Sequence, residues 1–241
     1  MEKILAWWFG GVTSAVACKL ALEKYSNVSI VFIETGSHHS DLYRFKKDCE
    51  KWYNQEILTI QSTKYTSVID VILSTKFVNG PFGARCTLEL KKEVRKKFTR
   101  DDKFDGSIWG FEYTNHEIDR AKRLLLDKTI NNPLFPLIEN KLNKKECVGL
   151  LKRENINIPQ MYKLGYNNNN CIGCVKGGAG YWNKIRIDFP EIFNQMMLAE
   201  IEINASCLKG TFLHSLDPKA GRKSDIILPE CGFFCQQTKF N

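Results

Sequence analysis

The 241-residue sequence predicts an α/β fold, a Rossmann-like and mainly parallel sheet with helices on both faces, followed by a small cysteine-containing C-terminal appendage. Three observations predict this fold class. Apolar strand-like segments alternate with helical ones over residues 3–139, the first of them runs directly into a glycine turn, and the composition changes after Pro159. Alternating strands and helices imply right-handed crossovers, which place helices over both faces of a parallel sheet.

The individual elements follow from hydrophobic periodicity and from turn and cap residues. The first strand is expected over residues 3–9, and an Ala/Leu-rich helix follows from Ser14 to about Tyr25. Further strands are expected over residues 28–34, 56–60, 107–111 and 133–138. Further helices are expected over 40–52, 67–73, 87–98 and 116–125, with a loop at 78–85. Asn143-x-x-Glu146 resembles a capping box and predicts a helix that extends to about residue 154.

A change of composition suggests two domains. Asn167 to Asn170 are four consecutive asparagines, and a CxxC and Gly177-Gly178 follow them. We therefore expect an adenine-nucleotide-binding α/β domain over residues 1–160 and a helical, loop-rich cysteine-ligand region over 161–241. Within the second region we expect a helix from about Tyr181 to Ile203 with a break before Pro190.

Composition excludes several classes of protein. Hydrophobic residues make up 43% and charged residues 26% of the chain, which excludes wholesale disorder and a fibrous protein. We find neither a signal-peptide pattern nor an apolar run of about 18 residues, so we expect a cytoplasmic protein without membrane association. A net charge of +8 suits an anionic partner, although a solvated basic surface remains the alternative. Nine cysteines in such a protein indicate metal, cluster or redox chemistry rather than a disulfide framework.

The segment Gly10-Gly11-Val12-Thr13-Ser14 is the first candidate binding site. A glycine turn between a strand and a helix directs backbone N–H groups and the positive helix N-terminus at an anion, and the two hydroxyls can donate to phosphate. The segment lacks the spacing and the lysine of a Walker-type loop. Glu34-Thr35-Gly36, at the tip of the second strand, can accept from a ribose hydroxyl or the adenine amine. The alternative for both segments is a plain turn.

Together these segments resemble the PP-loop superfamily, specifically the phosphoadenylyl-sulfate (PAPS) reductase-like family. Two further regions carry the resemblance, Arg85-Cys86-Thr87-x-x-Leu90-Lys91 and the stretch from Gly110 to Arg123. The resemblance implies that the chain binds ATP or PAPS, with Mg²⁺ as a possible companion, and that Gly110, Arg120 and Arg123 join the two segments in that site. Phe9 stands where the family usually has a serine. Since a phenyl ring cannot donate to phosphate, nucleotide binding is a firmer expectation than turnover.

Two cysteine pairs form the second candidate site. Cys171 and Cys174 form a CxxC, Cys231 and Cys235 form a CxxxC, and four thiolates can bind a [4Fe–4S] cluster or zinc. The resemblance favours the cluster, while free or redox-active thiols remain an alternative. Glu230-Cys231-Gly232 also resembles the segment whose cysteine attacks the sulfonate in PAPS reductases, although Phe233 replaces the family's histidine.

Cys86 is a second candidate catalytic thiol beside Cys231. Its loop precedes a basic helix, and the N-terminus of a helix lowers the pKa of a thiol and favours the reactive thiolate. The alternative is a buried, unreactive cysteine. Cys18, Cys49 and Cys147 fall within helical patterns and are expected to be core or half-buried thiols.

These features point to an adenine-nucleotide-dependent sulfur enzyme with two possible reactions. In PAPS reduction the nucleotide donates a sulfonate and a cysteine thiolate takes up its sulfur. In thiolation ATP adenylates a carbonyl oxygen of a base and a cluster delivers sulfur, which the paired cysteines and the basic charge favour.

Two other functions stay open. One is a nucleotide-binding subunit without turnover in a nucleic-acid modification or defence assembly, for which Phe9 argues. The other is a zinc-stabilised nucleic-acid binder. The expected partners are an adenine nucleotide and either a nucleic acid or a sulfur-donor protein, and the sequence sets no oligomeric state.

Overall fold

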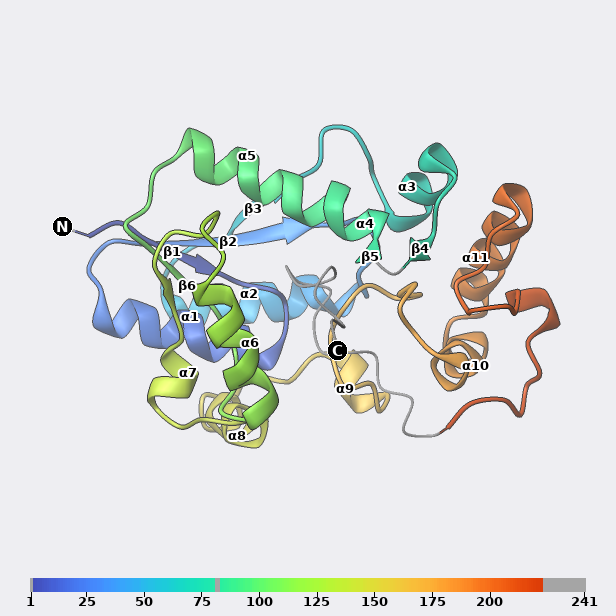
Figure 1. The fold of residues 1–241 in the computed structure, drawn as a ribbon. Coiled ribbons are helices and arrows are strands. Elements are labelled where there is room, and N and C mark those ends of the chain that lie inside the picture. Colours follow the sequence, from blue (N-terminus) through green and yellow to red (C-terminus); the bar gives the residue numbers. More distant parts are fainter. Residues whose placement is uncertain (1, 81–82, 223–241) are drawn as a thin grey trace. The chain divides into compact units, whose positions relative to one another are not determined.

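The computed structural model describes residues 2–80 and 83–222, which divide into two compact units (Figure 1). The first, here called the sheet unit, comprises residues 1–33, 40–60 and 97–163. The second, here called the thiol unit, comprises residues 34–39, 61–96 and 164–241, of which 223–241 are outside the described part. The domain boundary expected near residue 160 remains a prediction. None of the described helices is long and apolar enough to cross a membrane.

The described strands of the main sheet are β1 (Ile4–Trp7), β2 (Val28–Glu34), β3 (Leu58–Gln61), β6 (Gly106–Ile108) and β7 (Pro133–Leu134), in the order β3-β2-β1-β6-β7. β1 pairs in parallel with both β2 and β6, and Ile4 lies opposite Val28 on one side and Gly106 on the other. β6 and β7 are also parallel. The chain therefore reverses its direction of winding at β1, and in open α/β sheets ligands bind at the carboxyl ends of strands at such a point.

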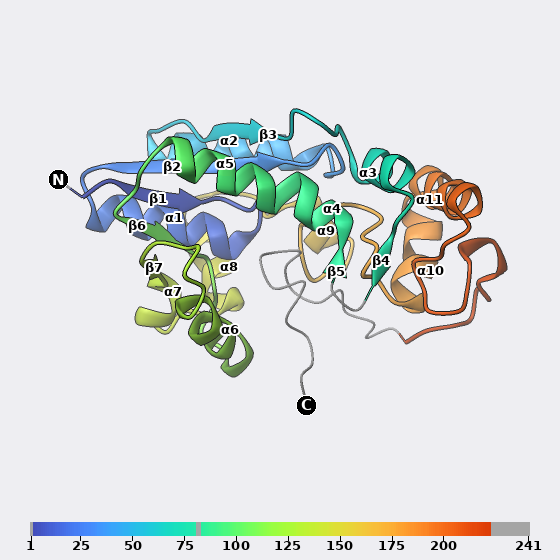
Figure 2. The same cartoon turned by 45° about the horizontal axis from the view of Figure 1, so that its top comes forward.

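Helices cover both faces of this sheet, as the sequence predicts (Figures 1 and 2). One face packs against α1 (Val12–Lys24), α2 (Asp41–Tyr53), α7 (Pro136–Glu139) and α8 (Lys144–Arg153) in a shared apolar core. Ile4 and Ala6 of β1 belong to that core. Trp7 alternates with them and meets Phe98 of α5 (Glu93–Asp101) on the other face, with ring centroids 6.3 Å apart. The remaining helices of the sheet unit are α6 (Asn115–Leu125) and α9 (Gln160–Lys163).

The structure confirms the predicted capping box and corrects the last predicted strand. The Asn143 side chain accepts from the backbone of Lys145 and Glu146, and the Glu146 carboxylate accepts from Asn143 N. The strand expected over residues 133–138 ends at Leu134, because Pro136 begins the helix α7 at a position that proline favours. Hydrophobicity alone does not separate a short buried strand from a short helix.

The helix expected over residues 87–98 is also corrected. It is interrupted, with α4 (Arg85–Thr87) leading through a π-helical turn, η1 (Leu88–Lys92), into α5. Residues 78–85, expected as a loop, contain the short antiparallel strands β4 (Asn79–Gly80) and β5 (Gly83–Ala84).

The thiol unit is mainly helical and contains α3 (Val68–Thr75), α4, η1, α10 (Ala179–Asp188), α11 (Pro190–Ile203) and the short 3₁₀ turn η2 (Leu213–Ser215). The break predicted before Pro190 separates α10 from α11. Glu200, which is 0% exposed, accepts from Cys207 N at 2.5 Å and from Leu213 N at 2.6 Å. This carboxylate therefore fixes the turn that follows α11.

Candidate functional site

The glycine loop joins β1 to α1 in the sheet unit. Gly10 has φ of +80°, a left-handed conformation that glycine adopts without strain, and Gly11 is the N-cap of α1. Gly11 has no side chain with which to cap the helix, and Val12 N, the first amide of α1, donates to the hydroxyl of Tyr162. The glycine turn thus lies between β1 and α1, as the sequence predicts, and its binding of phosphate remains a prediction.

Ser14 shapes this loop from within. Its hydroxyl donates to Gly11 O at 2.9 Å and accepts from Phe9 N at 3.1 Å, and the residue is only 2% exposed. Thr13 is partly exposed at the same end of the helix. The role of both hydroxyls toward phosphate remains a prediction.

Gly110 lies against the glycine loop. A Cβ atom added to Gly110 would lie 2.6 Å from Ser14 Cα and 2.8 Å from Ser14 N, which is closer than real Cβ contacts allow. The segment after β6 can therefore pass the start of α1 only with a glycine at this position. The sequence singled out Gly110 by resemblance, and the packing supplies the physical reason for a glycine there.

The two predicted arginines have different surroundings on α6. Arg120 is 5% exposed, and its Nη1 lies 2.7 Å from both carboxylate oxygens of Glu117. Its guanidinium also stacks on Phe111, 4.5 Å from the ring centroid. Arg123, in contrast, is exposed. Contact of either arginine with the nucleotide remains a prediction.

Phe9, which replaces the family's serine, packs among aromatic rings. Its ring centroid lies 6.5 Å from that of Trp7 and 5.8 Å from that of Trp109. The phenyl ring therefore joins an aromatic cluster, and the loop keeps its turn through the hydrogen bond from Phe9 N to Ser14.

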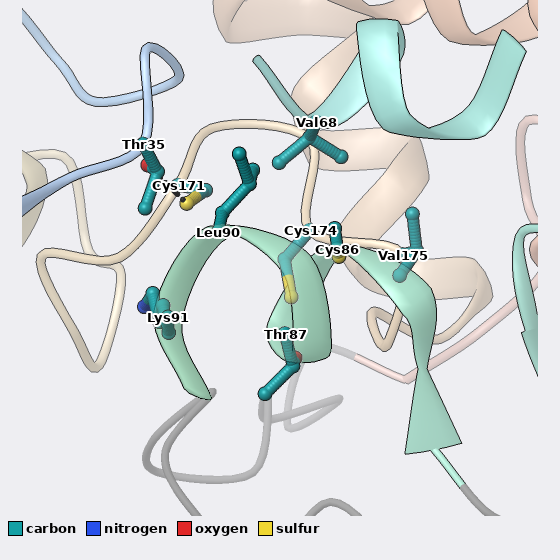
Figure 3. A pocket seen from close by; sticks show the side chains of 9 residues that line it. All are labelled: Thr35, Val68, Cys86, Thr87, Leu90, Lys91, Cys171, Cys174 and Val175. Carbon is teal, nitrogen blue, oxygen red and sulfur yellow. Dashed lines mark hydrogen bonds between the residues drawn. The ribbon is translucent and has the colours of Figure 1, made fainter. Parts of the chain in front are cut away.

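The thiol unit holds a pocket of about 280 Å³, including its opening, which we call the thiol pocket (Figure 3). Three of the described cysteines contribute to its wall, together with polar and apolar side chains from α3, α4, η1 and two loops. The lining residues are Thr35, Val68, Cys86, Thr87, Leu90, Lys91, Cys171, Cys174 and Val175. The pocket thus brings Cys86 together with the CxxC pair, from which it is far apart in sequence.

The Glu34-Thr35-Gly36 segment contributes to this pocket. The Glu34 carboxylate accepts from Thr35 N and Gly36 N, both at 2.7 Å, and so closes the turn. Thr35 Oγ1 lies 3.1 Å from Cys171 Sγ and 3.0 Å from His38 Nε2. The threonine hydroxyl therefore faces a sulfur atom of the pocket. The expected contact of Glu34 with ribose or adenine remains a prediction.

The predicted metal ligands are only partly within the described structure. Cys231 and Cys235, and with them the Glu230-Cys231-Gly232 segment, lie outside the described residues. Within residues 2–80 and 83–222, no three His, Cys, Asp or Glu side chains are placed to share a single metal ion.

The cysteines predicted as core thiols are buried. Cys18, Cys49 and Cys147 are all inaccessible, and burial raises the pKa of Cys49 and of Cys147 to about 12. Desolvation disfavours the thiolate, so both thiols are protonated at neutral pH. All three cysteines belong to the apolar core.

The sequence analysis missed one residue at the glycine loop. Tyr162 of α9 places its hydroxyl 3.4 Å from Val12 N, from which it accepts a hydrogen bond. α9 is a four-residue helix, too short for a periodic pattern, and its distance in sequence from Val12 hides the contact.

Comparisons with known proteins agree with this architecture. A sequence model of the phosphoadenosine phosphosulfate reductase domain matches residues 3–177. The uncharacterized protein MJ0973 of Methanocaldococcus jannaschii is 22% identical over 188 residues, which are 77% of this chain and 44% of that protein. The chain thus spans less than half the length of that relative. The crystal structure of a PAPS reductase from Candida auris, a phosphate complex, has a TM-score of 0.53 and 12% identity, over 71% of this chain and 82% of that one.

Proposed function

The chain belongs to the phosphoadenosine phosphosulfate reductase domain family, and from this premise we propose that it carries out sulfur chemistry that depends on an adenine nucleotide. In this proposal the glycine loop binds the nucleotide phosphates and the thiol pocket supplies the reactive sulfur. The observation that carries the proposal is the convergence of Cys86, Cys171 and Cys174 on one pocket. Lys91 of the same pocket adds a positive charge that suits an anionic sulfur compound.

PAPS reduction is the first form of the reaction. A cysteine thiolate attacks the sulfonate sulfur of PAPS, a new S–S bond forms, and the sulfur–oxygen bond to the phosphate breaks. The electron pair of that bond leaves with the nucleotide, and a second thiol then releases sulfite as a disulfide forms. Cys86 and Cys231 are the proposed nucleophiles, because Cys86 lies in the thiol pocket and the Cys231 segment resembles that of the family.

Thiolation is the second form of the reaction. ATP, accompanied by Mg²⁺, would adenylate a carbonyl oxygen of a base and release pyrophosphate, and a sulfur nucleophile would then displace that oxygen as part of AMP. The basic charge of the chain suits a nucleic-acid acceptor, and a sulfur-donor protein is the expected source of sulfur.

A [4Fe–4S] cluster is the proposed cofactor, with zinc as the alternative. The sulfur donors of Cys171, Cys174 and Cys86 suit either group chemically, and Cys231 and Cys235 remain proposed ligands. Two of the four proposed ligands, Cys231 and Cys235, lie outside the described residues, so the described side chains do not distinguish the cluster from zinc. Such a cluster supplies electron transfer or a sulfur-binding iron.

Two parallel assays on protein purified without oxygen test the proposal. PAPS with dithiothreitol should release sulfite if the chain is a reductase, and ATP with Mg²⁺ and a nucleic-acid acceptor should release pyrophosphate if it is a thiolation enzyme. Cys86→Ser should lower the active reaction about a hundredfold or more, while Cys147→Ala, which alters a core thiol, should change it little. Iron and sulfide analysis of the same sample distinguishes the cluster from zinc. Release of neither product would reject the enzymatic proposal.

Nucleotide binding without turnover is the second candidate function. Phe9 favours it, because its ring packs against Trp7 and Trp109 and offers phosphate no hydrogen bond. Isothermal titration with ATP and with PAPS, run beside the two assays, tests it. Tight binding together with the absence of sulfite and pyrophosphate would support this function, and turnover of either nucleotide would reject it.

A further inference from the structure

The two hydroxyls at the start of α1, those of Thr13 and Ser14, have different surroundings. A serine hydroxyl carries one proton, and Ser14 donates it to Gly11 O, 2.9 Å away. The same oxygen accepts from Phe9 N at 3.1 Å. The oxygens of an ionised phosphate only accept hydrogen bonds. Ser14 could therefore donate to a phosphate only after its bond to Gly11 had broken.

The packing of the first turn of α1 leaves one residue accessible to solvent. Val12, Ser14 and Ala15 are buried. Thr13 is partly exposed and is the one residue of this turn, as the structure describes it, that is not buried. Gly110 covers the backbone of the turn, since a Cβ at that position would lie 2.8 Å from Ser14 N. A ligand that approaches the first turn from solvent therefore meets Thr13.

Thr13 keeps the proton that such a ligand needs. Within residues 2–80 and 83–222, no residue accepts a hydrogen bond from its hydroxyl. A hydrogen bond from a hydroxyl to a charged oxygen is stronger than one between neutral groups. Resting on the nucleotide site of the proposed function, we infer that Thr13 donates its hydroxyl proton to a phosphate oxygen of the bound adenine nucleotide, and that Ser14 is a positioning residue that holds the loop. The two neighbouring hydroxyls thus have separate roles.

Thr13→Val and Thr13→Ser test the first role, because valine keeps the branched shape without the hydroxyl and serine keeps the hydroxyl. Isothermal titration of the full chain should show a Kd for ATP about tenfold higher for Thr13→Val than for the wild type. Thr13→Ser, the matched control, should stay within about threefold of the wild type. Neither variant should change the affinity for adenosine, which has no phosphate. The midpoint of urea unfolding without nucleotide should be the same for all three proteins, because the hydroxyl of Thr13 donates to no residue of the loop.

Ser14→Ala tests the positioning role. It removes the acceptor of the hydrogen bond from Phe9 N and the donor of the bond to Gly11 O. Without nucleotide, the amide of Phe9 should exchange with deuterium about tenfold faster than in the wild type, and the midpoint of urea unfolding should fall. Thr13→Val should change neither measurement, so the two substitutions separate support of the loop from contact with phosphate.

The outcomes also separate this inference from the proposed function. If the wild type binds ATP and Thr13→Val binds it equally well, the role of Thr13 is wrong and the nucleotide site stands. If Ser14→Ala weakens ATP binding while the exchange at Phe9 and the urea midpoint keep their wild-type values, Ser14 contacts the phosphate itself and the inference fails. If the wild type binds neither ATP nor PAPS, the proposed nucleotide site is wrong and the role of Thr13 with it, while the exchange at Phe9 still tests Ser14.

Discussion

At the scale of single residues, Gly110 connects backbone packing to the proposed nucleotide site. Gly110→Ala would push a methyl group into the backbone of Ser14, 2.6 Å from its Cα. Since backbone atoms cannot rotate away as a side chain can, we expect a loss of about 1–3 kcal/mol in the free energy of unfolding. The affinity for ATP should fall at the same time, because the strain acts at the start of α1. Urea unfolding and isothermal titration measure the two effects.

Gly149 provides a matched control for this change. It lies within α8, and no described atom outside its own helix lies within 4 Å of an added Cβ. Gly149→Ala should therefore stabilise the chain by about 0.5–1 kcal/mol, because alanine favours the helix. Equal effects of the two substitutions would contradict the close approach at Gly110.

The buried thiol of Cys49 should make the free energy of unfolding depend on pH in the alkaline range. Burial raises the pKa of its thiol to about 12, above the value of about 8.5 expected in the unfolded chain. The unfolded state therefore loses this proton first as the pH rises. The contribution of the buried Cys49 thiol to the free energy of unfolding is therefore complete below about pH 8.5 and decreases as the pH approaches 12.

Urea unfolding at several pH values between 8 and 11 measures this dependence. Other groups titrate in the same range, so the test is the difference between the wild type and Cys49→Ala. The variant should be less stable at pH 8 because it leaves a cavity, and its stability should decrease less steeply with pH. Parallel curves for the two proteins would show that Cys49 does not contribute.

At the scale of elements, the capping box of α8 supports the helix that carries the glycine loop, because α8 packs on α1. Asn143→Ala removes the acceptor for two backbone amides and should cost about 0.5–2 kcal/mol in the free energy of unfolding. Lys145→Ala, an exposed change in the same turn, should stay within about 0.5 kcal/mol of the wild type. Thermal or urea unfolding distinguishes the two, and an unchanged Asn143→Ala protein would mean that water replaces the cap.

The elements also show which local features the sequence can predict. The helix α8 and the break before Pro190 were predictable because caps and proline act on their immediate neighbours. The π-helical turn over Leu88–Lys92 could not be predicted in this way. The pattern of apolar residues does not determine whether a backbone amide donates to the carbonyl four or five residues before it. The run after Pro133 was misassigned because it is too short to show a period.

At the scale of the whole molecule, the net charge of +8 affects how the chain binds anions. The affinity for ATP should decrease several-fold between low and high ionic strength, because the screening length shrinks from about 10 Å at 0.1 M salt to about 3 Å at 1 M. The affinity for adenosine, which carries no phosphate, should change little. Titrations of ATP and of adenosine over a series of salt concentrations test this prediction. If the two affinities depended equally on salt, the positive charge of the chain would not contribute to binding of the phosphates.

The candidate site was predictable to the extent that it depends on short stretches of sequence. The glycine loop lies between one strand and the next helix, so its residues alone placed it at the end of β1. The thiol pocket depends on tertiary packing, which brings Thr35, Cys86 and Cys171 together from distant parts of the chain. Tyr162 meets Val12 for the same reason. Contacts of this kind require the fold and cannot be read from spacing.

The π-helical turn η1 also makes the thiol pocket sensitive to the length of the chain. A π-helical turn contains about one more residue than an α-helical turn, and such turns are frequent at functional sites. Deletion of one residue within Leu88–Lys92 would restore α-helical hydrogen bonding and rotate the preceding turn by about 100° about the helix axis. Cys86 would then turn away from Cys171 and Cys174 without any substitution of a cysteine. The loss of a single residue at this turn would therefore remove Cys86 from the pocket wall that it shares with Cys171 and Cys174.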